Sequence, residues 1–296
     1  MIRLNKFTAR CAAPAAAVWM TCLPSELCAA ERESQSQQAD KSGFNLLHPT
    51  PGELMRELSA DRPDKTDSPY TVDAGHFQVE IDLANTTRSL DQDSRLELYQ
   101  VAPLNLKLGV LNNLDVHLVL EPFTIERTKD LTTGDVEEKA GMGDLTPRFK
   151  VNLWGNDGGR TALALLPFVK LPTNQDGLGN QSAEGGIKVP FAVEVPGWDG
   201  SFMSEYDLVR DDRGSGYHPE SANSASAGHR LYGKLSWFLE FYSRVSTEAG
   251  SEWLGTVDTW LTYEVNRNLR LDGGAYVGMT SAADDLQLFL GFTWRF

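Results

Sequence analysis

Residues 286–296, the end of the chain, alternate strictly between two kinds of side chain. The even positions carry bulky apolar residues and the odd positions mostly do not, in the order Leu286, Gln287, Leu288, Phe289, Leu290, Gly291, Phe292, Thr293, Trp294, Arg295 and Phe296. A β-strand places successive side chains on opposite faces, so this period of two predicts a strand with one apolar face. That face must meet a nonpolar medium, and the opposite face does not.

Similar alternation recurs along most of the chain and predicts about twelve strands. The predicted strands are 76–83, 96–110, 114–120, 144–153, 163–171, 187–195, 202–209, 217–227, 235–241, 253–265, 269–279 and 286–296. The stretch 217–227 is poorly patterned and is included because single-chain bacterial barrels require an even number of strands. Short connections lie near 111–113, 155–159, 198–200, 229–232 and 266–268, and they interleave with longer polar ones at 84–94, 128–141, 172–185, 210–216, 246–251 and 280–285.

Short turns at one end and longer loops at the other are the layout of an outer-membrane β-barrel, with both termini at the short-turn end. An aromatic C-terminal residue such as Phe296 on an alternating strand also resembles the assembly signal at the end of bacterial outer-membrane barrels. The sequence therefore predicts an all-β fold, a transmembrane antiparallel β-barrel of about 12 strands formed by residues 74–296. A soluble β-sandwich has a similar pattern, but the aromatic end and the absence of any helical stretch favour the barrel.

The N-terminus has the features of a secretory signal peptide. Arg3, Lys6 and Arg10 precede an apolar, alanine-rich run, and small residues end it near Ala30. This order predicts a signal peptide over residues 1–30 and export to the cell outer membrane. A membrane anchor is the weaker interpretation because the run is interrupted by prolines and is too short to span a bilayer.

Cysteine usage and charge exclude several functions. All three cysteines, Cys11, Cys22 and Cys28, lie in the predicted signal peptide, so the mature chain has no disulfide, thiolate metal site or cysteine nucleophile. The formal net charge is −14 and becomes about −16 once residues 1–30, with three cations and one acid, are removed. Nucleic acid is therefore not an expected partner.

Residues 31–73 are polar and lack strand alternation. We predict a periplasmic N-terminal tail here, mobile or with a short helix over 51–58, that leads into the first strand through the turn-rich stretch 61–70. For residues 31–58, a plug that fills the lumen is the less favoured interpretation.

Three segments carry a resemblance to a known family. They are the entry 61–80 (DRPDKTDSPYTVDAGHFQVE), the segment 143–150 (GDLTPRFK) and the ending 269–296, which includes LRLDGG and GFTWRF. Together they make residues 58–296 similar to the outer-membrane transporter family named after the MetA pathway of phenol degradation. The resemblance implies passive uptake of small solutes, with hydrophobic or aromatic compounds as the leading expectation. The alternatives are a closed structural or binding barrel without transport and a lipid-acting outer-membrane enzyme.

If the apolar stripes face lipid, the residues between them line the lumen. The predicted lumen-lining residues are Glu80, Asp82, Glu97, Lys107, His117, Glu121, Arg148, Lys150, Lys170, Lys188, Glu194, Phe238, Glu240, Arg244, Asp258, Trp260, Arg270, Asp272, Tyr276 and Arg295. Most of these charges are expected to pair across the lumen, and some to form a polar constriction that selects solutes. The aromatic side chains either fill a narrow barrel or contact a passing aromatic solute.

No residue pattern supports catalysis, a cofactor or a metal site. His76, His117, His218 and His229 lack a serine two positions on, and no Gly-x-Ser-x-Gly motif is present. The acidic pairs 137–138, 211–212 and 284–285 lie in predicted loops, where solvated charges are the ordinary case. The expected partners are outer-membrane lipid and lipopolysaccharide, the barrel-assembly machinery through the strand ending at Phe296, and a small-molecule solute.

Overall fold

The computed structural model describes residues 40–212 and 216–296. The predicted signal peptide lies outside the described residues, as does the first part of the predicted tail. The described chain is almost entirely β-structure, and its helical part is one turn of 3-10 helix, Gly52–Leu54. No helix in the described residues is long and apolar enough to cross a membrane.

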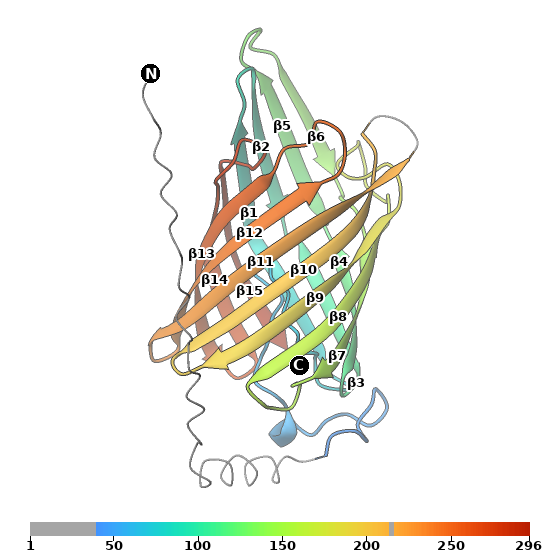
Figure 1. The fold of residues 1–296 in the computed structure, drawn as a ribbon, viewed down its shortest axis with the longest axis vertical. Helices are drawn as coiled ribbons and strands as arrows, with labels where there is room; N and C mark the ends of the chain where they lie inside the picture. The colour runs from blue at the N-terminus through green and yellow to red at the C-terminus, as the bar shows by residue number, and fades with distance from the viewer. Residues whose placement is uncertain (1–39, 213–215) are drawn as a thin grey trace, which may run out of the picture. The chain divides into compact units, whose positions relative to one another are not determined.

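Fifteen strand segments form one sheet. Their bounds are β1 Phe77–Leu90, β2 Ser94–Val101, β3 Leu104–Leu111, β4 Leu114–Leu120, β5 Phe123–Asp130, β6 Val136–Gly141, β7 Thr146–Trp154, β8 Thr161–Lys170, β9 Glu184–Val195, β10 Trp198–Arg210, β11 Tyr217–Tyr232, β12 Leu235–Ser246, β13 Leu254–Asn266, β14 Leu269–Gly278 and β15 Leu286–Arg295. The last strand, β15, pairs with β1 and closes the sheet, so β1, β3, β4 and β7 to β15 form a 12-strand antiparallel barrel (Figure 1). The predicted fold is confirmed.

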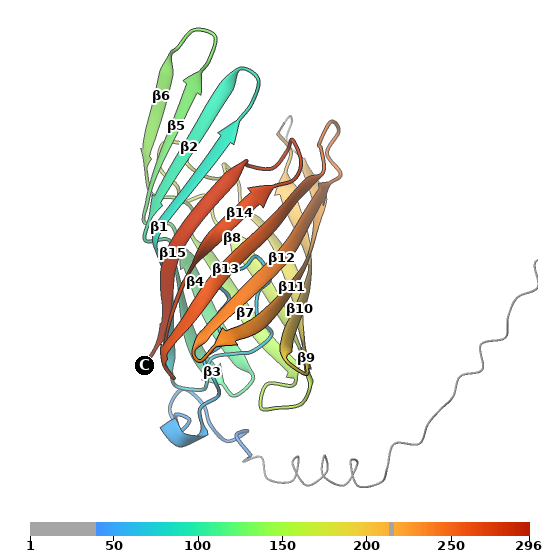
Figure 2. The same cartoon turned by 90° about the vertical axis from the view of Figure 1, so that its left-hand side faces the viewer.

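The remaining three segments, β2, β5 and β6, leave the barrel wall. The lower part of β1 pairs with β3 and its upper part with β2, while β5 pairs with β2, and β6 with β5. Figure 2 shows the result, a sheet that projects beyond one rim of the barrel. We call β2, β5, β6 and the upper part of β1 the rim extension. Each of its strands continues a barrel strand beyond the rim. The sequence predicts β2 and β3 as one strand, 96–110, and assigns much of the rest of the extension to the loops 84–94 and 128–141.

Two of the interruptions lie at prolines. Pro103 separates β2 from β3, and Pro122 separates β4 from β5. Ala102, just before Pro103, has a left-handed φ of 57°, so the strand gains an irregular residue there. Because the side-chain period of a strand is two, one inserted residue exchanges the two faces.

The barrel is apolar outside and polar inside. Outward-facing Phe202, Phe241 and Leu261 remain substantially exposed, whereas inward-facing Asp115 and Asp258 are fully buried. A soluble protein distributes its residues in the opposite way. The closed ladder also leaves the wall without a free edge. Both features are those of a barrel whose outer surface contacts lipid.

The two ends of the barrel differ. The turns that join β3 to β4, β11 to β12 and β13 to β14 are only a few residues long, whereas the opposite end carries the longer connections and the rim extension. Phe296 exchanges backbone hydrogen bonds of 3.0 Å with Phe77 at the short-turn end, and their rings stack. The start of the barrel and the end of the chain are thus fastened together.

Residues 58–73 lie inside this barrel. Leu58, Asp61, Thr66 and Asp73 are buried, and their neighbours in space are inward-facing residues of the wall. Residues 58–73 of the predicted periplasmic tail therefore lie in the lumen, a position that the sequence did not predict for them. The physical reason is that the lumen is polar, so a polar segment is as well suited to it as to water.

Candidate functional site: the occupied lumen

Residues 61–73, here called the lumenal segment, cross the barrel interior and bind its wall through charged side chains. At the start of the segment Asp61 accepts from two buried lysines, with its carboxylate oxygens 2.6 Å from Lys107 Nζ and 2.5 Å from Lys150 Nζ. Lys107 also contacts Glu80, which accepts a hydrogen bond from the Asp61 backbone. This group is completely enclosed, and each charge in it has a partner of opposite sign.

The next residues of the segment bind a neighbouring part of the wall. Arg62 forms ion pairs with Asp82 and with Asp272, the latter at 2.7 Å. Lys65 Nζ lies 3.0 Å from Asp258 and above the Tyr276 ring, 4.4 Å from its centroid. These contacts attach the segment to β1, β13 and β14.

The backbone of the segment is held as well. Glu240 accepts hydrogen bonds from the N–H groups of Lys65 and Thr66, at 3.0 and 2.9 Å. The Thr66 hydroxyl lies 2.6 Å from the Ser224 hydroxyl. A carboxylate that accepts two successive backbone N–H groups fixes the path of the chain, because it satisfies donors that would otherwise be buried without partners.

Asp67 completes the set on the side of β7 and β9. Its carboxylate lies 2.7 Å from Lys188 Nζ and 3.6 Å from Arg148. The segment therefore contacts β1, β3, β7, β9, β12, β13 and β14 within seven residues, which is most of the circumference.

The segment leaves the barrel at the short-turn end, where a second group of charges holds it. The fully buried Asp73 pairs with Arg56 and Arg295, both at 3.4 Å. Arg56 also binds Asp157 in the turn between β7 and β8, at 2.9 Å. Partial burial alone would raise the pKa of Asp157, but the hydrogen bond from Asn112 and the Arg56 guanidinium outweigh it and hold that pKa below its usual range.

Two cavities lie on either side of the segment. The upper cavity, of about 570 Å³, opens toward the rim extension and is lined by both charges and rings, among them Arg148, Phe168 and Tyr242. The lower cavity, of about 480 Å³, opens toward the short-turn end. Arg62 and Asp64 line both cavities, so the lumenal segment is the partition between them.

The structure places most of the predicted lumen-lining residues inside the barrel, where they contact the lumenal segment or line one of the two cavities. Glu80, Asp82, Lys107, Arg148, Lys150, Lys188, Glu240, Asp258, Asp272 and Tyr276 contact the lumenal segment directly. Glu121, Lys170 and Arg244 line the upper cavity, and Glu194, Phe238, Trp260 and Arg270 line the lower one. His117 is buried beside Asp115 at 2.8 Å, and Arg295 binds Asp73.

Glu97 is the exception. It lies in β2 opposite Arg88 of β1 and Arg127 of β5, on the outward face of the rim extension. The prediction is wrong here because Ala102 and Pro103 interrupt the strand, and the faces exchange between β3 and β2. Leu96 and Leu98 consequently lie on the inward face of the extension.

Sequence reasoning missed the lumenal partners themselves. The sequence predicts a turn-rich, charged lead into the first strand for Asp61, Arg62, Lys65 and Asp67, yet these residues supply the main contacts to the wall. The available signal was a mismatch: a barrel interior with so many charges needs partners, and a charged segment just before the first strand can supply them.

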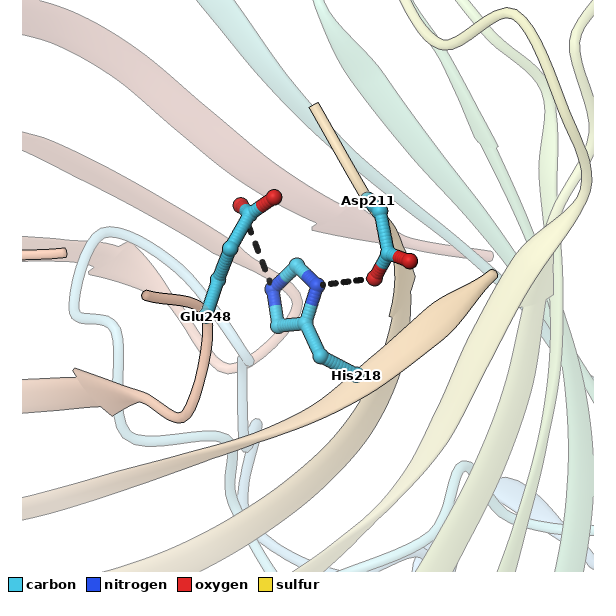
Figure 3. A group of neighbouring side chains, drawn as sticks. All are labelled: Asp211, His218 and Glu248. Atoms are coloured by element: carbon cyan, nitrogen blue, oxygen red, sulfur yellow. Dashed lines mark hydrogen bonds and ion pairs between the residues drawn. The ribbon is translucent and has the colours of Figure 1, made fainter. Parts of the chain in front are cut away.

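A smaller group of titratable side chains lies at the rim. Asp211, His218 and Glu248 come from three chain segments, and Figure 3 shows the imidazole between the two carboxylates. Asp211 is 3.0 Å from Nδ1, while Glu248 and Glu220 approach Nε2 at 3.9 and 3.4 Å. The carboxylates thus approach opposite ring nitrogens, which is the arrangement of an imidazole held by acids on both sides.

The partners recorded for His218 are carboxylates, and the one recorded for His117 at hydrogen-bonding distance is also a carboxylate. Neither histidine has a hydroxyl nucleophile among its partners in the described part of the chain. The arrangement of Ser, His and acid that hydrolases use is therefore not formed by these two histidines.

A closed ladder, an apolar outer surface and a polar lumen occupied by its own N-terminal segment define the class: an outer-membrane type of β-barrel with an internal plug. The chain belongs to the family described as "Putative MetA-pathway of phenol degradation", whose sequence model matches residues 60–296. The matched region begins with the lumenal segment, so this segment and the barrel belong to one unit.

Solved structures with a similar fold come from several functional groups. A protein described as the CymD monoaromatic hydrocarbon channel aligns with 9% identity over 74% of this chain and 87% of its own, with a TM-score of 0.42. The transport unit of the autotransporter AIDA-I from Escherichia coli aligns with 13% identity over 81% and 93%, with a TM-score of 0.43. The outer-membrane protease OmpT from Escherichia coli aligns with 11% identity over 75% and 96%, with a TM-score of 0.27. At these values none of the three assigns a substrate or an activity, and no curated protein matches the chain.

Proposed function

We propose that the protein resides in the outer membrane and lets small solutes, aromatic compounds foremost, pass through its lumen when the lumenal segment moves aside. Family membership supports the aromatic class, since the family is named for phenol degradation. The upper cavity supports it as well, because the rings of Phe168, Tyr242 and Tyr276 line it beside cationic side chains. Rings that flank a polar passage offer an aromatic solute stacking contacts without a deep binding site.

The observation that carries the proposal is the partition. Two cavities of about 570 and 480 Å³ face opposite ends of the barrel, and the same residues, Arg62 and Asp64, line both. Displacement of the segment would join the cavities into one passage. The segment can move without opening the wall, because it is attached covalently to the barrel only through the start of β1.

A disulfide lock tests this proposal. The hydroxyl oxygens of Thr66 and Ser224 are 2.6 Å apart, so the double variant Thr66→Cys, Ser224→Cys places two thiols where they can bond. Residues 31–296 contain no competing cysteine. We expect brief openings from the refolded wild-type chain in a planar bilayer, none from the oxidised lock, and their return after reduction. Small aromatic acids are expected to block the openings.

The matched control is a lock within the wall. Ser204 and Asn223 face each other across β10 and β11 with side-chain oxygens 2.8 Å apart, far from the lumenal segment. The double variant Ser204→Cys, Asn223→Cys should conduct equally when oxidised and reduced. Openings from an oxidised Thr66/Ser224 lock would show that solutes do not need the segment to move.

The density of buried ion pairs around the segment favours a second candidate, a closed barrel that serves binding or structure. Asp61, Lys107 and Lys150 are enclosed, and such groups are costly to separate. If neither the folded and inserted wild-type protein nor the reduced lock conducts ions, the channel proposal is wrong and this candidate is supported.

A further inference from the structure

The outward face of the rim extension carries a group of cations. Arg88 of β1, Arg95 of β2 and Arg127 and Lys129 of β5 all have exposed side chains. Strand register places these four residues on the same face, because Arg88 is opposite Glu97, Glu97 is opposite Arg127, and Arg95 is opposite Lys129. We call this group the cationic patch. It is unusual in a chain whose net charge is −14.

The patch lies on the side of the extension that continues the outer, apolar surface of the barrel. In β1, Asn85 and Thr87 are buried and face inward, so Arg88 faces outward. Arg88 is also paired with Leu286, and two residues closer to the barrel Thr86 is paired with the exposed Leu288. On the same surface Arg88 therefore lies beyond Leu288, and Leu90 lies beyond Arg88, beside Arg95.

The order of residues along the extension shows how far from the barrel the patch lies. Nearest the barrel, Val101 is opposite Phe123, and the next row pairs Tyr99 with Ile125. The following row holds Arg88, Glu97, Arg127 and Glu138, and the row beyond it holds Leu90, Arg95, Lys129 and Val136. Rows on one face are about 7 Å apart. The cations thus begin one row above the last aromatic residue, where a membrane passes from acyl chains to charged headgroups.

One pair in the patch is unfavourable in isolation. Arg95 and Lys129 are directly opposite each other on neighbouring strands, and like charges in that position destabilise a sheet. Among the described residues neither one forms an ion pair, and Arg88 forms none. The single pair recorded in the patch is the long contact of 4.0 Å between Arg127 and Glu97.

The acids near the tip do not neutralise the patch. Asp91, Asp93, Asp130 and Asp135 lie in or beside the hairpin turns, and within the described chain none of them pairs with the four cations. Asp130 instead accepts hydrogen bonds from the backbone of Thr132 and Thr133. Glu138, opposite Arg127, is the remaining acid on this face.

We propose that the cationic patch binds the phosphate groups of lipopolysaccharide in the outer leaflet. The inference rests on the proposed location in the outer membrane, where these phosphates lie just above the acyl chains. Arginine presents paired N–H donors that match a phosphate, and lysine supplies a point charge. A phosphate between Arg95 and Lys129 would convert their repulsion into two attractions, and the apolar rows below would contact the acyl chains.

Binding by the purified full-length chain in detergent tests this assignment with lipid A as the probe. Each cation near a charged lipid surface contributes about a fivefold change in affinity, so Lys129→Gln should weaken binding of bisphosphorylated lipid A about fivefold. The double variant Arg95→Gln, Lys129→Gln should weaken it about 30-fold. Arg95→Lys keeps the positive charge and should retain most of the wild-type affinity for lipid A. Dephosphorylated lipid A should bind wild type as weakly as bisphosphorylated lipid A binds the double variant.

Lys139 provides the matched control. It lies in β6 of the same extension but in register with Glu126, on the inward face, and pairs with it at 3.4 Å. Lys139→Gln should change lipid A affinity less than twofold. Equal losses of lipid A affinity in Lys129→Gln and Lys139→Gln would mean that only the net charge matters, which would overturn the site. Binding of phosphatidylglycerol with the same affinity as lipid A would overturn the assignment to lipopolysaccharide.

A stability measurement gives a second readout, which a purely structural role would not produce. In detergent without lipid, Arg95→Gln should leave the Tm unchanged or raise it, since it removes a repulsion. In lipopolysaccharide-containing membranes the same variant should lower the Tm. A change of the same sign in both media would overturn the proposal. Neither experiment depends on conductance, and cell fractionation separately tests the location.

Discussion

The two halves of the barrel wall are built differently. From β10 to β15 the ladders run almost without interruption, and every residue from Asp199 to Arg210 has a partner in β11. From β1 to β9 the wall is repeatedly broken, and six prolines lie in its strands or connections, namely Pro103, Pro122, Pro147, Pro167, Pro172 and Pro190, whereas the strands of the other half contain Pro219 alone. The regular half is a plain wall, whereas the irregular half sends out the rim extension and supplies Lys107 and Lys150 to the lumen.

The breaks are concentrated around β8. Its ladder with β7 pairs Arg148 with Phe168 and then Val151 with Leu165, passing over the residues opposite Pro167. Its ladder with β9 passes over the position of Pro190 in the same way. Proline has no N–H to donate, so Pro167 and Pro190 each remove a possible backbone donor from the region where the two ladders of β8 are interrupted.

The comparison shows what the lumenal segment does for the fold. Asp61 binds lysines of β3 and β7 in the irregular half, while Lys65 and Thr66 bind β12 and β13 in the regular half. The segment is therefore a strut between a strongly and a weakly hydrogen-bonded wall. Closing the lumen and supporting the irregular half are two results of one set of contacts.

The largest effect is expected from the strut. Asp61→Ala leaves Lys107 and Lys150 buried without their main partner, which should cost about 3–5 kcal/mol of unfolding free energy. Unfolding in micelles by urea, followed by tryptophan fluorescence, measures it. Glu126→Gln is the control, because its exposed pair with Lys139 should be worth less than about 1 kcal/mol. Equal losses from the two variants would mean that the segment does not brace the wall.

A smaller effect, of opposite sign, is expected from the prolines. Pro167→Ala and Pro190→Ala each restore a backbone donor in a ladder of β8, and each should add about 0.5–1.5 kcal/mol of stability. Amide hydrogen exchange should show slower exchange in β8. Pro196→Ala, in the turn between β9 and β10, restores no ladder bond and should leave exchange in β8 as it is. Unchanged protection in the first two variants would mean that the interruptions have another cause.

The smallest effect concerns which face a residue occupies. Glu121 lines the upper cavity and Glu97 lies on the outer face of the extension, although both carry the same charge. Glu121→Gln should shift the ion selectivity of open channels toward anions, whereas Glu97→Gln should leave selectivity unchanged. Reversal potentials in a salt gradient measure this difference. An equal shift in the two variants would contradict the exchange of faces at Ala102.

The regular half was predictable because each strand keeps one apolar face along its length. Phe202 to Leu208 and Leu235 to Phe241 show this period in the sequence and keep it in the structure. In the irregular half the period continues through a change of face, so Glu97 could not be assigned correctly from its neighbours. The residue type that signals this interruption is Pro103, because proline is seldom found inside a central strand.

The lumenal segment could not be predicted by periodicity at all. Its polar residues look solvated because a charged turn and a charged plug have the same composition. A charged plug differs from a charged turn in having partners of opposite charge. Asp61 binds Lys150 and Arg62 binds Asp272, and both partners are far away along the chain. Such pairs become visible only when the barrel closes and brings distant strands to one lumen.

The position of the strut in the chain also fixes an order of events. Residues 61–73 precede every strand in the chain, yet their partners come from β1 to β15 and are brought together by the pairing of β1 with β15. The complete set of contacts between the segment and the wall can therefore exist only in the closed barrel.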